Sequence, residues 1–200
     1  MIVYKEPGHW AWFIPVDSET TSVGVGSAVK GFSLRGSVAR LRAEAGLDEA
    51  EVIRREGAPI PLKPLRRWDN GRDVVLAGDA AGVVAPASGE GIYYAMLSGR
   101  LAAGAVARFV ESRDPATLAE PRRRFQKAHG RTFAVLGFMQ WFWYRNDKRR
   151  EKFVTMCKDA DVQRLTWESY LNKKLVRKDP MAHVRVFIKD MRQLLRPAAH

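Results

Sequence analysis

Gly78 and Asp79 directly follow an unalternated apolar run, Val74–Ala77. Such a run is typical of a strand that is covered on both faces in a parallel sheet. The glycine lets a ligand approach the backbone closely, and the carboxylate accepts hydrogen bonds from the hydroxyls of a sugar or another polyol. The pattern therefore predicts a polyol-binding turn at the carboxyl end of a buried strand.

A loop with Pro86, Gly89 and Gly91 comes next and leads into a run of small and apolar residues, Ile92–Val110, which predicts a helix. The unpaired N–H groups and the positive dipole end of such a helix favour negative charge. A Gly-Asp turn alone occurs in many α/β domains. Run, turn, loop and helix together predict a cofactor site.

The residues before this site predict a hairpin, a helix and an extended connector. Two strand-like stretches, Trp10–Val16 and Thr21–Ala28, flank a polar turn, and Leu34–Ala45 has the spacing of an amphipathic helix that Gly46 ends. Val52–Arg55 is predicted to form another short strand. Three prolines within residues 57–64 predict an extended connector back to the cofactor domain.

The residues after the site are predicted to be helical. Asp114 and Pro115 have the residue types of an N-cap and first helical position. Breaks are expected near Gly130, near Asn146 and at Asp179–Pro180.

Three segments, residues 55–96, 138–157 and 165–185, resemble the geranylgeranyl reductases of chlorophyll and bacteriochlorophyll synthesis. These belong to the FAD-dependent oxidoreductases similar to p-hydroxybenzoate hydroxylase. The resemblance implies that the Gly-Asp turn holds the flavin ribityl chain, that the next loop and helix face the isoalloxazine ring, and that NADPH reduces the FAD. The cofactor-binding positions it implies are Gly78, Asp79, Ala80, Pro86, Gly89, Glu90, Gly91 and Ile92.

A second, weaker resemblance concerns the opening strand. The wider reductase family carries a YxWxFP motif that lines the isoprenoid pocket, and here only Trp12 and Pro15 match it. Trp10 stands in place of the tyrosine and Ile14 in place of the phenylalanine. The resemblance implies a pocket-lining role for Trp12 and Pro15. It supplies no proton donor, because an indole N–H has no usable acidity, and aromatics that merely fill a half-buried sheet remain the alternative.

The expected fold class is α/β: a substrate-binding α+β sheet portion in residues 1–64, part of a Rossmann-like FAD-binding domain in residues 65–113, and a basic helical module in residues 114–200. The family's GxGxxG unit is not found. Gly24–Gly31 comes nearest, but Val29 occupies the place of its third glycine. We therefore expect this chain to be the carboxyl half of a longer enzyme, whose amino-terminal half is its missing partner.

Charge is distributed unevenly along the chain. Residues 122–200 carry 20 basic and 7 acidic side chains, whereas residues 1–121 carry 14 and 15. Aromatic residues at 138–144 directly precede Arg145 and Lys148. This arrangement favours contact with a membrane surface. Nucleic acid is a less favoured partner, because no nucleic-acid recognition module is present. The apolar run at 133–144 is too short to span a bilayer, and no signal peptide is found. The expected location is cytoplasmic, peripheral to the photosynthetic membrane.

Other chemistries have little support. The four histidines, His9, His129, His183 and His200, lack metal-ligand spacing, so no metal is expected. His129 and His183 are expected to have surface or capping roles. There is no GxSxG nucleophile motif. The single Cys157 excludes an internal disulfide, fits a reducing compartment and is expected to be an apolar filler.

The favoured function is reduction of isolated C=C bonds in a geranylgeranyl chain, carried either by a chlorophyll-type pigment or by diphosphate. One alternative is a flavin monooxygenase of the same superfamily. The other is a non-enzymatic basic fragment that docks on membranes, in which the flavin motif is only structural. The catalytic proton donor is not assigned.

Overall fold

The computed structural model describes residues 9–173. The chain divides into two compact units that separate between Gly57 and Ala58.

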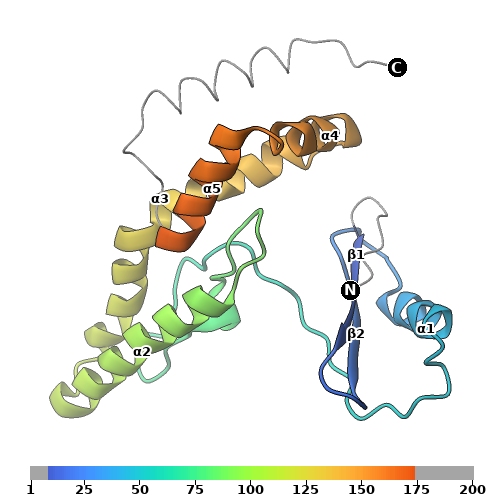
Figure 1. The fold of residues 1–200 in the computed structure, drawn as a ribbon. Helices are drawn as coiled ribbons and strands as arrows, with labels where there is room; N and C mark the ends of the chain where they lie inside the picture. The colour runs from blue at the N-terminus through green and yellow to red at the C-terminus, as the bar shows by residue number, and fades with distance from the viewer. Residues whose placement is uncertain (1–8, 174–200) are drawn as a thin grey trace. The chain divides into compact units, whose positions relative to one another are not determined.

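The first unit is a two-stranded antiparallel sheet with one helix beside it (Figure 1). β1 (His9–Pro15) pairs with β2 (Thr21–Ser27). Asp17 fixes the turn between them, because its Oδ1 accepts the N–H groups of Glu19 at 2.9 Å and Thr20 at 2.6 Å. The predicted hairpin is confirmed.

The two glycines of β2 make room for tryptophans. Trp12 and Trp10 lie directly opposite Gly24 and Gly26 in the ladder. A Cβ at either glycine would collide with the indole ring across from it. These glycines therefore allow the two strands to pack closely. This agrees with the prediction that Gly24–Gly31 is not a dinucleotide-binding motif.

α1 (Leu34–Glu44) packs beside β2. It begins at Ser33, whose Oγ accepts the N–H of Gly36 at 3.2 Å, and it ends before Gly46 at φ +68°. This helix was predicted. The strand predicted at Val52–Arg55 is wrong: these residues are exposed and in irregular structure, and the described chain pairs them with no other strand.

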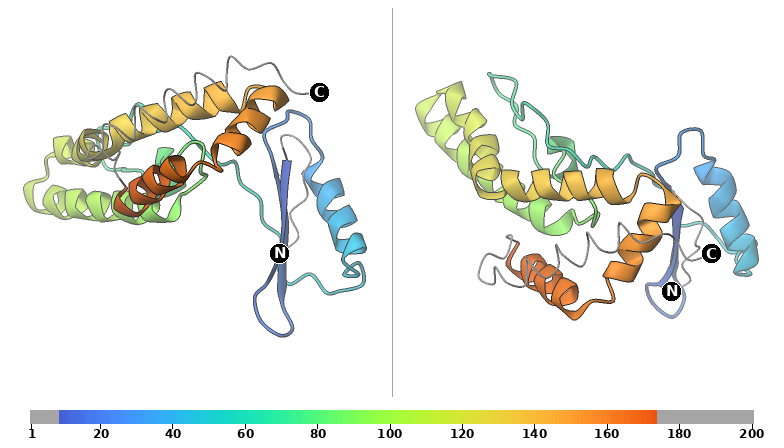
Figure 2. Two further views of the ribbon diagram at one scale, coloured as in Figure 1. Left: turned by 45° about the horizontal axis from the view of Figure 1, so that its top comes forward. Right: turned by 90° about the horizontal axis from the view of Figure 1, so that it is seen from above.

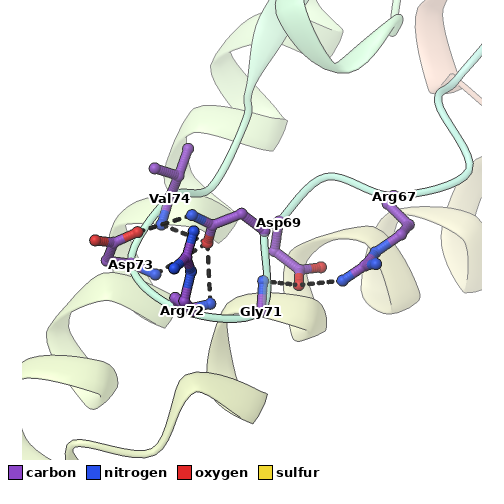
Figure 3. Close-up of polar contacts among 7 residues, drawn as sticks. Arg67, Asp69, Gly71, Arg72, Asp73 and Val74 are labelled. Carbon is purple, nitrogen blue, oxygen red and sulfur yellow. Dashed lines mark hydrogen bonds and ion pairs between the residues drawn. The ribbon is translucent and has the colours of Figure 1, made fainter.

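Within the second unit, a turn at residues 69–74 hydrogen bonds largely to itself (Figure 3). Asn70 Oδ1 accepts the N–H groups of Arg72, Asp73 and Val74 at 2.9–3.0 Å. Asp69 accepts the N–H of Gly71 at 2.9 Å and faces Arg67. The turn directs the chain into Val75, Leu76 and the cofactor-type segment.

The buried parallel strand predicted at Val74–Ala77 is wrong. Only an isolated bridge, Asp69 to Val75, is formed there, and Leu76 N–H donates to the carbonyl of Trp68 at 2.6 Å. A strand requires a neighbouring strand for its backbone groups. Among residues 9–173 no such neighbour lies beside this run, and Val74 is exposed.

A short 3₁₀ turn, η1 (Gly78–Ala81), and then helices follow. α2 (Ile92–Ser112) lies alongside α3 (Glu120–Trp143), and the 3₁₀ turn η2 (Pro115–Ala119) joins them (Figure 2). α4 (Asp147–Met156) and α5 (Ala160–Asn172) complete the described chain. As predicted, Asp114 caps the turn at Pro115, accepting the N–H of Ala116 at 2.9 Å.

The predicted helix breaks have mixed outcomes. The break near Asn146 is confirmed, because Asn146 caps α4 by accepting the N–H of Arg149 at 3.0 Å. The break near Gly130 is wrong: α3 continues through it, because Phe125 and Phe133 on either side are buried in one core. Asp179–Pro180 lies outside the described residues.

The core of the second unit is largely aromatic. It contains Trp68, Ala81, Val83, Ala85, Tyr94, Phe125 and Phe133. His129 also belongs to it, since its ring centroid lies 5.4 Å from those of Tyr94 and Phe125. The predicted surface or capping role for His129 is therefore wrong: its i, i+4 spacing from Phe125 places it on the buried face of α3. His183 lies outside the described residues.

The described residues form a mixture of helices and one small sheet, so the coarse expectation of mixed α and β structure holds. The Rossmann-like portion remains a prediction. Of the helices within residues 9–173, none combines the length and the apolarity needed to cross a membrane.

Candidate functional site: a turn, a loop and the amino end of α2

The turn at Gly78 is attached to α2 by a buried serine. Gly78 has φ +58°, and its N–H donates to Ser98 Oγ at 2.9 Å. Ser98 is fully buried, and its hydroxyl donates in turn to the carbonyl of Tyr94 at 2.7 Å. Ser98 was not predicted from the sequence. The only sequence feature that could have indicated its role is its position: Ser98 is a polar residue on the inner face of an apolar helix. It lies seven residues, or about two helical turns, after Gly91.

Asp79 lies on the surface beside the amino end of α2. A Cβ built on Gly91 would stand 3.6 Å from Asp79 Oδ1 and 3.4 Å from Val84 Cγ2. Any side chain at residue 91 would therefore enter the space next to the carboxylate. Asp79 and Ala80 are both exposed, so the turn presents its polar edge to solvent.

The loop between turn and helix folds back on itself. Ala85 N–H donates to the carbonyl of Glu90 at 2.8 Å, and Gly89 N–H donates to the carbonyl of Ala85 at 3.0 Å. Pro86 is buried beneath the loop, whereas Gly89 is exposed at φ +70° with open space where a Cβ would point. The tip of this loop is therefore open to solvent.

α2 begins without a side-chain cap. Its N-cap is Gly91, and Ile92 at its first position is exposed. The first turn of a helix has N–H groups without intrahelical partners, so the positive end of α2 faces the space beside Asp79 and Gly89. This combination of a carboxylate and a helix amino end suits a ligand that carries both hydroxyls and negative charge.

Tyr94 is an ionisable group directly under the site. Burial, followed by the nearby Glu90 carboxylate and the Tyr93 hydroxyl, raises the pKa of Tyr94 to about 12. Tyr94 therefore remains a neutral phenol over the physiological range.

Glu90 is partly buried and paired with Lys173, at 2.7 Å from Nζ to Oε2.

The eight residues that are predicted to bind the cofactor all lie within one continuous segment, which comprises the turn, the loop and the start of α2. Their cofactor contacts remain predictions.

Trp12 and Pro15 belong to the first unit. Trp12 Nε1 donates to Ser22 Oγ at 3.2 Å, which uses its only donor within the hairpin, and Pro15 is exposed at the end of β1. Their contact with substrate remains a prediction.

Cys157 is exposed, so its predicted role as an apolar filler is wrong. Desolvation by neighbouring atoms raises the pKa of its thiol. Within residues 9–173, no three His, Cys, Asp or Glu side chains are grouped as metal ligands.

The sequence of the chain matches one known family. This chain belongs to the family described as lycopene cyclase protein, which matches residues 19–194. Among curated relatives, it is 50% identical over 188 residues to the geranylgeranyl diphosphate reductase of Rhodobacter capsulatus, which covers 94% of this chain and 48% of the relative. It is 38% identical to the protein of that name in Synechocystis, over 95% of this chain and 48% of the relative.

The chloroplastic geranylgeranyl diphosphate reductase of Oryza sativa is 36% identical over 96% of this chain and 42% of the relative. The chain thus spans somewhat less than half the length of these relatives. No solved structure matches it significantly.

Proposed function

We propose that this chain is part of an FAD- and NADPH-dependent geranylgeranyl reductase, and that residues 78–92 hold the flavin. One observation carries the proposal: a single segment contains the exposed Asp79, the exposed Gly89 and the start of α2 at Gly91, which has no side-chain cap. The relatives named geranylgeranyl diphosphate reductase match this same region and almost the whole chain.

The residues fit a flavin nucleotide. Asp79 would accept hydrogen bonds from ribityl hydroxyls, the Gly89 and Gly91 backbone would lie against the ring, and the amino end of α2 would face its most electronegative edge. Bound FAD would supply the hydride chemistry, with NADPH as its reductant. Ser98 and the buried core hold the turn in place.

The proposed reaction adds two hydrogens across an isolated C=C bond of a geranylgeranyl chain: NADPH supplies the hydride, and a proton goes to the other carbon. An isolated alkene accepts hydride poorly, so the site must hold it dry and close to the ring. We propose that Trp12 and Pro15 contribute apolar surface for this isoprenoid, as diphosphate or as pigment ester. The dinucleotide-binding GxGxxG half would come from sequence outside these 200 residues.

Loss of the Asp79 carboxylate tests the flavin site. The chain, joined to the portion of the Rhodobacter capsulatus relative that it does not match, is titrated with FAD and followed by flavin fluorescence. Asp79→Ala is expected to weaken binding about 10- to 100-fold, because hydrogen bonds to a charged group are lost.

Asp73→Ala is the matched control, since that carboxylate only accepts a hydrogen bond from Asn70 at 2.8 Å within the turn. Asp73→Ala should bind FAD as tightly as the parent. If Asp79→Ala does so as well, residues 78–92 do not hold the flavin.

Oxygen dependence separates the reductase from the flavin monooxygenase. A reductase saturates the isoprenoid with NADPH under argon, whereas a monooxygenase requires oxygen. The names of the relatives favour the reductase. NADPH-dependent turnover only in air would reverse that choice.

We further propose peripheral docking on an anionic membrane through α3 and α4. Phe138 and Trp141 on α3 are 60% and 58% exposed. The Arg145 guanidinium lies 5.6 Å from the Trp141 ring, and that of Arg149 lies 4.5 Å from the Phe142 ring. Exposed aromatics bordered by guanidinium groups fit the headgroup level of a bilayer.

Vesicle cosedimentation tests the docking. The chain is expected to bind phosphatidylglycerol vesicles and not phosphatidylcholine vesicles, and Trp141→Ser with Phe138→Ser should reduce binding about 10-fold. Equal binding of both lipids, or no effect of the double substitution, contradicts membrane docking through this surface.

A further inference from the structure

The amino end of α2 is held from a distant part of the chain. Lys173, directly after α5, places its Nζ 2.7 Å from Glu90 Oε2, and both side chains are only 16% exposed. The same ammonium lies 3.7 Å from the centroid of the Tyr170 ring and 5.4 Å from that of Tyr93. One cation thus contacts the loop, the first turn of α2 and α5 together.

Two further contacts from the helical module reach the same loop. Tyr144, which follows α3, donates its hydroxyl to the carbonyl of Ala87 at 3.1 Å. Gly137 of α3 packs toward Pro86, since a Cβ built on it would stand 4.0 Å from Pro86 Cγ. The loop is therefore held at Pro86, at Ala87 and at Glu90.

The loop conformation requires such support. Ala87 has φ +65°, and the left-handed region costs a residue with a Cβ about 1 kcal/mol. Tyr144 bonds to the carbonyl of this strained residue. Burial, and then the nearby Cys157, raise the pKa of Tyr144, so its hydroxyl remains a donor.

The charge of Glu90 also requires its partner. An unpaired carboxylate next to the amino end of α2 would compete with an anionic ligand for the positive end of the helix. Paired with Lys173, the carboxylate is neutralised at short range, and the helix end stays available.

We propose that Lys173 is a positioning residue: it holds the Pro86–Gly91 loop against the flavin and neutralises Glu90, with Tyr144 as a second holding point. This inference rests on the proposed function. It makes the helical module part of the cofactor site, in addition to any membrane contact.

Three variants of the fused protein described above test the proposal. Lys173→Ala should weaken FAD binding about 10-fold, because one charge-assisted contact to the loop is lost. Lys173→Arg, which keeps the charge, should restore most of the affinity. Arg164→Ala is the matched control, because Arg164 lies on α5 and pairs within it, with Glu168 at 3.4 Å and Asp161 at 3.6 Å.

A second readout separates positioning from general stability. The reduced flavin carries more negative charge than the oxidised form, so an unpaired Glu90 should weaken binding of reduced FAD more than that of oxidised FAD. The reduction potential of bound FAD should therefore fall in Lys173→Ala, and adding Glu90→Gln should reverse the fall. A purely structural role would lower the melting temperature and leave the potential unchanged.

Hydrogen exchange in the absence of FAD distinguishes failure of this inference from failure of the flavin assignment. Amides of residues 87–92 should exchange faster in Lys173→Ala and in the milder Tyr144→Phe than in Arg164→Ala. If the parent binds no FAD, the proposed function fails, and the exchange rates alone decide whether Lys173 orders the loop. If Lys173→Ala matches Arg164→Ala in affinity, potential and exchange, the inference is overturned.

Discussion

The aromatic side chains beneath the candidate site and those of the hairpin are placed in opposite ways. In residues 58–173, Trp68 and Phe125 are completely buried, with ring centroids 5.2 Å apart. In the hairpin unit, Trp10 is 43% exposed and its indole ring occupies the space next to Gly26, as that of Trp12 does next to Gly24. The aromatics beneath the candidate site close a core, whereas the two tryptophans of the hairpin lie along one face of a sheet.

This difference indicates which unit fixes geometry and which offers surface. The aromatic core lies directly under α2 and η1, and it therefore fixes the turn and the helix start that form the candidate cofactor site. A two-stranded sheet has little core of its own, so the exposed Trp10 and the half-buried Trp12 are suited to contact an apolar ligand. The second unit thus holds the candidate cofactor site in a fixed geometry, and the hairpin unit offers apolar surface.

Truncating the core should give the largest effect. Phe125→Ala is expected to lower the free energy of unfolding by about 3–5 kcal/mol, because it leaves a cavity among Trp68, Tyr94 and Phe133. Urea denaturation followed by tryptophan fluorescence measures it. A loss below about 1 kcal/mol would show that this core is not what stabilises the second unit.

Ser98→Ala should have the next largest effect. It leaves the N–H of Gly78 without its side-chain acceptor, which is expected to cost about 1–3 kcal/mol and to loosen the turn that carries Asp79. Denaturation and FAD titration are measured on the same samples. Ser112→Ala is the control, because it removes an exposed hydroxyl that donates to the carbonyl of Arg108 and accepts the N–H of Asp114, away from the site. Equal losses in the two variants would contradict a special role for Ser98.

Local signals predicted most elements of this fold. A polar turn between alternating strands gave the hairpin, Gly46 ended α1, and Asn146 began α4. Each of these depends on side chains within a few residues of the feature. The strand at Val74–Ala77 failed because its formation depends on a neighbouring strand, and its composition cannot show whether one is present.

The candidate site was predicted in part for the same reason. The segment from Gly78 to Ile92 is continuous in sequence, so its motif was visible. The contacts that hold it come from Ser98, Tyr144 and Lys173, which are up to 83 residues from their partners. The burial of His129 was likewise missed, because it depends on which face of α3 packs against Tyr94.

A smaller effect on the free energy of unfolding should appear at alkaline pH, and it should arise from Tyr94 in the second unit. The folded chain holds the Tyr94 proton more tightly than the unfolded chain, since its pKa is raised from 10.0 to about 12. This stabilisation is complete below pH 10 and is lost as the pH rises from 10 to about 12, by about 1–2 kcal/mol after allowance for partial solvation. Tyr94→Phe should flatten that part of the curve of unfolding free energy against pH. An unchanged curve would mean that another group titrates there.

The hairpin should give the smallest effect on stability and a separate effect on substrate. Trp12→Ala removes a ring that covers Gly24 without filling a closed core, so the free energy of unfolding should fall by about 1 kcal/mol or less. In the fused enzyme the same change should raise KM for geranylgeranyl diphosphate about 10-fold with FAD affinity unchanged, as expected for lost apolar contact with the isoprenoid. Trp12→Phe, which keeps an aromatic ring over Gly24, should recover part of that loss. If Trp12→Ala instead matches Phe125→Ala in stability, the hairpin aromatics are core after all, and the division between a unit that fixes geometry and a unit that offers surface does not hold.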